Sequence, residues 1–161
     1  MKLSTLQLVV KNWVIDRCGK DSFEAPQERI TRVLEEAFEL AQVLGLDKKA
    51  IKALLKHVYS RPEGAVNQEL AGVGVTLLAL AESLGFNLLT VIETEVDRLP
   101  NISKSRISRK ILMNSNKGIG LQLTDDQVKY HMAQCLLEGT ENVVKIGNVT
   151  ITRKGYEEYS R

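Results

Sequence analysis

Cysteine is scarce in this sequence. The chain has two cysteines, Cys18 and Cys135, which lie far apart and lack the spacing of a metal-binding motif. This scarcity excludes a disulfide-rich scaffold. We expect two free thiols in a reducing compartment, although a single disulfide between them is also compatible with the sequence.

A membrane-spanning run is missing as well. The most apolar window, Leu70–Ala81, is too short to cross a bilayer. The stretch Leu6–Ile15 is interrupted by Lys11 and Asn12 and is followed by no small-residue cleavage site, so it does not predict a signal peptide. The formal net charge of +2 provides no strong field for a nucleic acid or a membrane. We therefore expect a cytoplasmic protein with no membrane partner, and the global charge does not favour nucleic acid as a partner.

The composition, 43% hydrophobic and 26% charged, is ordinary for a globular protein, and 161 residues favour one domain with room for an appendage. Hydrophobic periodicity predicts an all-α helical bundle of about five helices within residues 1–100. Asp47, Asn67 and Asn87 are the expected N-caps of the last three helices. The predicted helices cover residues 3–17, 26–44, 47–60, 67–84 and 87–99.

The predicted helix 67–84 has no charged residue from Leu70 to Ala81, which is typical of a helix at the centre of a bundle. Gly72 and Gly74 each cost about 1 kcal/mol in a helix interior relative to Ala. Their presence indicates either close approach of another backbone or a ligand, or tight helix packing alone.

The last third of the chain has a different character. Residues 101–123 are basic and rich in Ser, Asn and Gly, and we expect a linker or tail there. Thr124 and Gln127 form a capping-box pattern, which predicts a helix to about Glu138. Two β-branched runs around Gly147-Asn148 then predict a β-hairpin. Residues 124–161 are therefore expected to form a small helix-plus-hairpin appendage.

The most informative segment holds three acids on one helix. Glu35, Glu36 and Glu39 fall within one arc of about 100° beside an apolar face. Like charges at this spacing repel each other. Carboxylates held close together beside a buried face suit a hard divalent cation, whereas the ordinary alternative is a solvated acidic surface.

A further acid, Glu69, opens the otherwise uncharged helix. A carboxylate beside a core helix is costly unless it has a partner. A metal shared with the Glu36 and Glu39 helix satisfies all three acids. The alternative is a favourable first-turn position for Glu69 near the helix dipole, after the Asn67 cap.

These residues resemble the MazG-like all-α nucleoside triphosphate pyrophosphohydrolases, over roughly residues 1–100. That family carries Glu-Glu-x-x-Glu on one helix and Glu-x-x-Asp on a later one, and together they hold Mg²⁺ against the triphosphate. The resemblance implies that Glu36, Glu39 and Glu69 ligate the metal. It implies that Glu35 is a ligand or the base that orients the attacking water.

The sequence departs from the family pattern at two positions. Gly72 replaces the acid three residues after Glu69, and Glu95 stands where the family often has a phosphate-binding Lys. An acid lost at one position and gained at the other fits a relocated metal ligand. We favour Glu95 over Glu93 for this role, and the alternative is that both acids are simply exposed.

The predicted reaction is Mg²⁺-dependent hydrolysis of a nucleoside triphosphate to the monophosphate and pyrophosphate, with Mn²⁺ as a substitute metal. A purine deoxynucleotide such as dGTP or dATP is the favoured substrate. Arg61 and Arg98, with Lys104 or Arg106, are candidates to bind phosphate, and each is otherwise a solvated charge. Trp13 and Tyr59 are candidates to contact the base, and a core position is the alternative. We expect His57 and His131 to be structural or exposed.

Two other functions remain open. The first alternative is a nucleotide-binding module without turnover. The second is a helical scaffold or nucleic-acid-binding protein that uses the basic stretch 98–117. The helix 67–84 is too apolar to be exposed, and the rest of a five-helix bundle does not cover it. MazG-like proteins also commonly assemble. We therefore predict a homo-oligomer, in the form of a tetramer.

Overall fold

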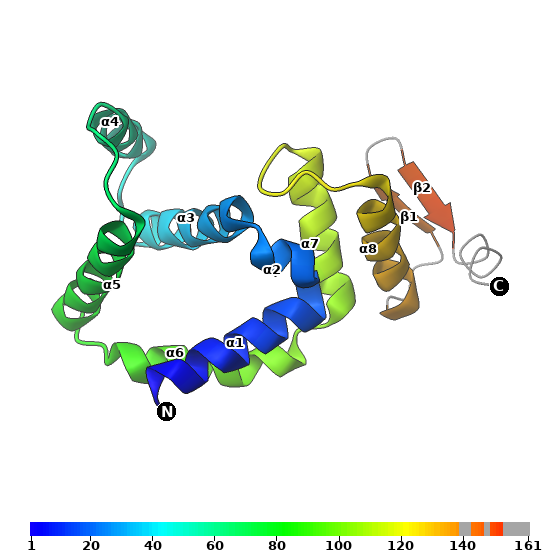
Figure 1. The fold of residues 1–161 in the computed structure, drawn as a ribbon, viewed down its shortest axis with the longest axis horizontal. Helices are drawn as coiled ribbons and strands as arrows, with labels where there is room; N and C mark the ends of the chain where they lie inside the picture. The colour runs from blue at the N-terminus through cyan, green and yellow to red at the C-terminus, as the bar shows by residue number, and fades with distance from the viewer. Residues whose placement is uncertain (139–142, 147–148, 153–161) are drawn as a thin grey trace. The chain divides into compact units, whose positions relative to one another are not determined.

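The computed structural model describes residues 1–138, 143–146 and 149–152 (Figure 1). Helices dominate this part of the chain, which confirms the all-α class. The elements are α1 (Leu3–Cys18), α2 (Lys20–Glu24), α3 (Pro26–Val43), α4 (Lys48–Tyr59), α5 (Val66–Ser83), α6 (Leu88–Arg98), the 3₁₀ turn η1 (Leu99–Asn101), α7 (Lys104–Asn116), α8 (Asp125–Glu138), β1 (Val143–Ile146) and β2 (Val149–Thr152).

The chain divides into two compact units. The first unit comprises residues 1–33 and 96–161, and the second comprises residues 34–95. The boundaries fall inside α3 and near the end of α6. This division by compactness differs from the predicted domains 1–100, 101–123 and 124–161.

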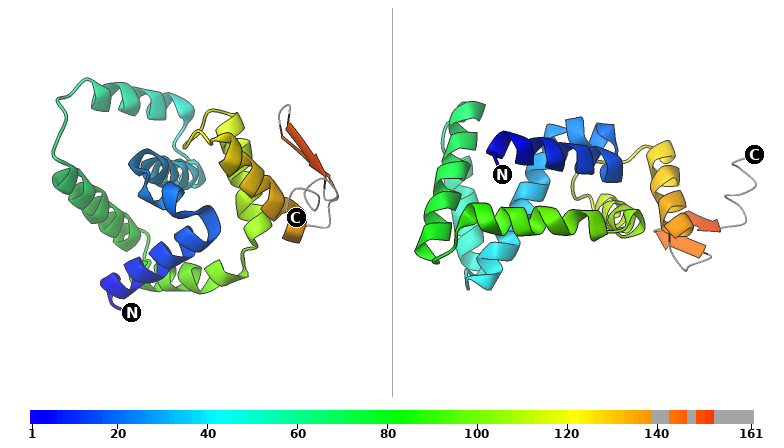
Figure 2. Two further views of the ribbon diagram at one scale, coloured as in Figure 1. Left: turned by 45° about the vertical axis from the view of Figure 1, so that its right-hand side comes forward. Right: turned by 90° about the horizontal axis from the view of Figure 1, so that it is seen from below.

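In the first unit, α7 and α8 pack side by side (Figure 2). Strand β1 packs against both helices. Their shared core is formed by five buried residues, Leu112, Met132, Cys135, Leu136 and Val144. The strands pair antiparallel, with Val143 opposite Thr152 and Ile146 opposite Val149. The predicted hairpin strands are thus confirmed, and the predicted turn at Gly147-Asn148 lies outside the described residues.

Several local signals work as the sequence predicts. Asp47 Oδ1 accepts from the backbone N–H of Ala50 at 2.7 Å, and Asn87 Oδ1 accepts from that of Thr90 at 3.0 Å. The capping box of α8 closes in both directions, since Thr124 N–H donates to Gln127 Oε1 and Gln127 N–H donates to Thr124 Oγ1. The prediction of Asn67 as an N-cap is wrong. Helix α5 begins at Val66, its N-cap is Ala65, and no side chain makes a capping hydrogen bond.

Two predicted irregular segments are helical. The expected loop Gly19–Glu24 contains α2, which follows a sharp turn at Gly19 with a φ of 88°. The expected linker 101–123 contains α7. Ser103 is the N-cap of this helix, and its hydroxyl accepts a hydrogen bond from the N–H of Arg106. The linker prediction is therefore wrong over 104–116. The segment is polar in overall composition, but it forms a narrow apolar stripe along α7. Helix α8 covers this stripe, where Leu112 is only 3% exposed.

A buried carboxylate joins two distant segments of the first unit. Glu28, on α3, is 6% exposed and accepts a hydrogen bond from the N–H of Leu121 at 2.6 Å. The same carboxylate pairs with Arg32 at 3.0 Å and Arg29 at 3.4 Å. Gly120 lies directly against it, with a φ of 78°, and a Cβ there would collide with the carboxylate. The loop from α7 to α8 is thus fixed on the start of α3.

In the second unit, α5 is exposed along its length. Leu70, Val75 and Leu78 are 72%, 65% and 59% exposed, and Ala81 is the one buried residue of the helix. A Cβ added at Gly72 or Gly74 would meet nothing within 4 Å. Within the described residues of the second unit, no helix packs closely over α5, so the central position expected for this helix is not observed there. No single helix of the described chain has the length and apolarity of a membrane span.

Replacement of Glu28 by Ala should lower the free energy of unfolding by about 3 kcal/mol, because it removes a buried carboxylate that two partly buried guanidinium groups and one amide N–H share. Chemical denaturation followed by circular dichroism measures this loss. Glu24→Ala is the matched control: this carboxylate is 58% exposed in a surface pair with Lys20, so its loss should cost less than about 0.5 kcal/mol. Equal losses for the two variants would contradict the structural role of Glu28.

Candidate functional site

The three acids of the predicted motif lie on α3 within the second unit. Glu36 and Glu39 are exposed, and Glu35 is half-buried and engaged in an interaction. The apolar face beside them is open as well, with Leu34 and Phe38 46% and 47% exposed. The acids therefore border an uncovered apolar surface rather than a packed core.

The other predicted acids come from α5 and α6. Glu69 lies in the first turn of α5 and is exposed, so it does not have the costly core position that the sequence suggested. Glu95 is exposed and Glu93 is half-buried on α6, and both are engaged in interactions. Within the described residues, no three Asp, Glu, His or Cys side chains are grouped to hold a metal ion. The carboxylate donors suit Mg²⁺ chemically, but the described part of one chain does not assemble them.

A pocket of about 400 Å³ forms where α4 leads into α5. Three of the residues predicted for the site line it: Tyr59 and Arg61 from the substrate set and Glu69 from the metal set. The carboxylate of Glu69 folds back onto the backbone of Gly64, where a Cβ would collide with it. The second unit thus gathers an aromatic ring, a guanidinium group and a carboxylate around one opening.

Trp13 and Arg98 belong to the first unit. The indole N–H of Trp13 donates to the carbonyl of Leu99 at 3.0 Å, which ties α1 to the turn after α6. The ring is half-buried, and Arg98 is exposed and engaged in an interaction. The hydrogen bond gives Trp13 a structural role, while its contact with a base stays a prediction.

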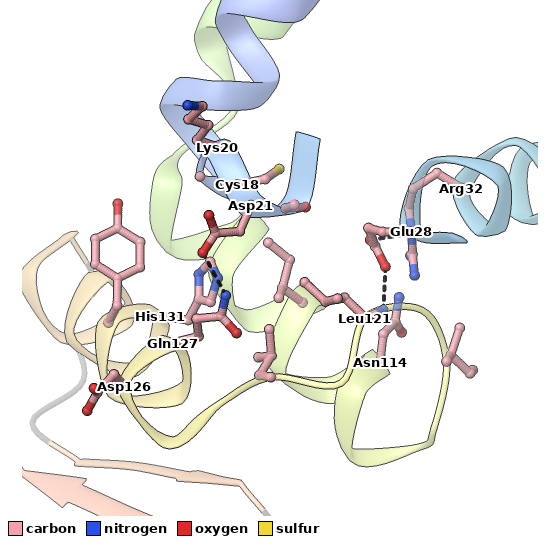
Figure 3. A pocket seen from close by; sticks show the side chains of 16 residues that line it. Cys18, Lys20, Asp21, Glu28, Arg32, Asn114, Leu121, Asp126, Gln127 and His131 are labelled. Atoms are coloured by element: carbon pink, nitrogen blue, oxygen red, sulfur yellow. Dashed lines mark hydrogen bonds and ion pairs between the residues drawn. The ribbon is translucent and has the colours of Figure 1, made fainter. Parts of the chain in front are cut away.

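The first unit holds a separate cavity of about 310 Å³ (Figure 3). Ile111, Leu121 and Leu123 form part of its apolar lining. Asp21 accepts a hydrogen bond from the Gln127 amide at 3.1 Å, and the Glu28 carboxylate points to the Leu121 amide on another side (Figure 3). No pattern in the sequence predicts this cavity, because its residues come from five separate segments that meet only in the folded chain.

Burial shifts the pKa of two side chains that line this cavity. Burial lowers the pKa of His131 to about 4, and its Nδ1 is 3.0 Å from the Ser108 hydroxyl. Burial raises the pKa of the Cys18 thiol, which disfavours the thiolate nucleophile. Neither Cys18 nor Cys135 is joined in a disulfide in the described residues. His131 is structural and His57 is exposed, as the sequence analysis expects.

No family model, curated protein or solved structure matches this chain.

The buried His131 should make stability depend on pH. Its folded pKa of about 4 lies below the ordinary 6.5, so the unfolded chain binds a proton that the folded chain does not. The stability it contributes is complete above pH 6.5 and is lost as the pH falls towards 4. Between pH 7 and pH 5 this one group should lower the free energy of unfolding by about 2 kcal/mol.

Urea denaturation of His131→Gln at both pH values measures the effect. This variant keeps a hydrogen-bonding side chain opposite Ser108 but cannot ionise near neutral pH, so its stability should change less between the two pH values. His57→Gln is the control, because His57 is exposed on α4 and the variant should retain the full pH dependence. An unchanged pH dependence in His131→Gln would contradict the assignment.

Proposed function

We propose that the protein is a Mg²⁺-dependent nucleoside triphosphate pyrophosphohydrolase of the MazG-like type, with its site in the second unit. The observation that carries the proposal is the pocket at the start of α5. Tyr59, Arg61 and Glu69 are predicted separately for base, phosphate and metal, and all three line this one pocket.

Each group in the pocket has a chemical task in the proposed reaction. The guanidinium of Arg61 offers paired N–H donors to phosphate oxygens. The ring of Tyr59, 82% exposed, is available to stack on a base. The carboxylate of Glu69 supplies a hard oxygen donor for a divalent cation.

The α3 acids complete the proposed donor set. Glu36 and Glu39, with Glu95, provide further metal ligands, and Glu35 orients the water that attacks the α-phosphorus. When bound, Mg²⁺ would neutralise phosphate charge and lower the pKa of a coordinated water. The attack releases pyrophosphate and leaves the nucleoside monophosphate, and a purine deoxynucleotide such as dGTP or dATP is the proposed substrate.

Assembly of several copies completes the site in this proposal. The described part of one chain leaves wide apolar surfaces of α3, α4 and α5 in solvent, far beyond the isolated apolar residues of an ordinary monomer. Representative exposures are 47% for Phe38, 55% for Leu54 and 72% for Leu70. Burying these faces against other copies, in a homotetramer, covers them and brings further carboxylates to the pocket.

Incubation with a panel of ribo- and deoxynucleoside triphosphates and Mg²⁺ should release monophosphate and pyrophosphate in equal amounts, as measured by ion-exchange chromatography. EDTA should stop the reaction and Mn²⁺ should restore it. Glu36→Gln and Glu39→Gln should each lower kcat/KM by at least about 100-fold, because a lost metal ligand matters more than a lost outer partner. Glu82→Gln, an exposed acid at the end of α5, is the matched control and should leave turnover unchanged.

Two results separate the alternatives. Nucleotide binding without release of pyrophosphate would identify the non-catalytic nucleotide-binding module instead. Full turnover in both Glu36→Gln and Glu39→Gln would remove the α3 acids from the reaction and refute the proposed site.

Size-exclusion chromatography with light scattering should report a homo-oligomer with the mass of four chains. Leu78→Glu should shift the population towards smaller species, because it places a charge on the apolar face of α5, where Leu78 is 59% exposed. Ser83→Glu adds the same charge at an exposed polar position of the same helix and should leave the mass unchanged. A wild-type chain that elutes only as a monomer would contradict the assembly.

A further inference from the structure

Helix α7 and its C-cap carry most of their positive charges on one side. Arg106, Arg109 and Lys110 on α7 and Lys117 at its C-cap are all exposed, and at 100° per residue they fall within an arc of about 100°. We call these four residues the α7 cationic face. No acid occurs in the sequence from Arg98 to Thr124, so the local positive field is not offset along the chain.

The structure separates this face from the other cation of the helix. Lys104 donates to Asp16 at 2.8 Å, so its charge is used to tie α7 to α1. This pairing lowers the pKa of Asp16. The predicted basic tail thus holds one cation directed to α1 and a set of exposed cations along one side of α7.

The α7 cationic face is held rigidly from behind. Ser108 and Leu112, on the opposite side of the helix, are buried, and the Ser108 hydroxyl bonds to His131 of α8. At the start of the helix, the N–H of Ser105 donates to the Glu138 carboxylate at 3.0 Å. Cations on an anchored helix lose less conformational freedom on binding than cations on a flexible tail.

We infer that the α7 cationic face binds the phosphate backbone of a nucleic acid duplex. Arg106 and Lys117 are eleven residues apart, which corresponds to about 16 Å along a helix. Each strand of a duplex presents one phosphate per 3.4 Å of axis, so this line of cations matches several consecutive phosphates. A single phosphate group calls for donors that converge on one point, and these cations are spread along a line.

A lipid surface fits the same face poorly. A helix that lies in a membrane interface inserts a broad apolar side between its lipids. The apolar side of α7 is occupied by packing against α8 and β1, where Leu112 is 3% and Val144 is 1% exposed. Met113 is the one large apolar side chain among the exposed residues of α7. The face therefore offers charge without the apolar surface that membrane insertion needs.

The test measures binding of the full chain to fluorescently labelled 20-base-pair DNA and RNA duplexes by anisotropy, as a function of NaCl concentration. If four cations contact phosphates, the slope of log K against log[NaCl] should be about −3.6, and affinity should fall about 150-fold from 50 to 200 mM. Comparison of the two duplexes identifies which nucleic acid is preferred. Absence of binding to both duplexes at 50 mM NaCl would overturn the inference.

Arg109→Ala/Lys110→Ala removes half of the cationic face and should reduce the slope to about −1.8, so that affinity falls only about 12-fold over the same salt range. Arg109→Lys/Lys110→Arg preserves the charge and should retain the wild-type slope. Lys52→Ala/Lys56→Ala, which removes two exposed cations of α4, is the matched control and should also retain it. Thermal denaturation followed by circular dichroism verifies that each variant is folded.

Two further measurements decide between explanations. Glu36→Gln/Glu39→Gln should bind the duplex as the wild type does, so failure of the hydrolase proposal and failure of this one remain distinguishable. Vesicles with anionic phosphatidylserine should not bind. Binding to vesicles but to neither duplex, or an unchanged slope in Arg109→Ala/Lys110→Ala, would overturn the inference.

Discussion

The Glu28 carboxylate accepts a hydrogen bond from Leu121, pairs with Arg29 and Arg32, and lies against Gly120, all within a space from which solvent is largely excluded. A charge in such a place is tolerated only when several donors surround it. The consequence is architectural, because the start of α3 and the loop between α7 and α8 are 93 residues apart in sequence. Fixing that loop also fixes part of the lining of the first unit's cavity, which includes both Glu28 and Leu121.

The two units differ in how much of their apolar surface they bury. The first unit buries its apolar stripe internally, with Met132, Cys135 and Leu136 almost completely enclosed between α7, α8 and β1. The second leaves its apolar residues in solvent, because in the described residues α3, α4 and α5 are not packed pairwise. Exposed apolar surface on this scale is unfavourable in water and favours association. In the proposed enzyme, the same association that covers these faces would complete the metal site.

Local features of the sequence predicted local structure well. The caps of Asp47 and Asn87 and the capping box of Thr124 and Gln127 form as expected, since each depends on atoms only three residues apart. The failures have a common cause. The segment that forms α7 was predicted to be a linker from its polar composition, yet contact with α8 stabilises it as a helix. The acids predicted for a metal site have the expected helical positions, but their convergence requires contacts between helices that no single segment encodes.

The sequence by itself determined the order and type of most elements and the residues worth testing, because these follow from spacing, capping and composition within short stretches of chain. Only the tertiary structure decided that Glu28 is buried among arginines and bound to the Leu121 amide, and that Lys104 is tied to Asp16. Burial and proximity are properties of segments that meet in space, and a linear pattern carries no record of which surface covers which.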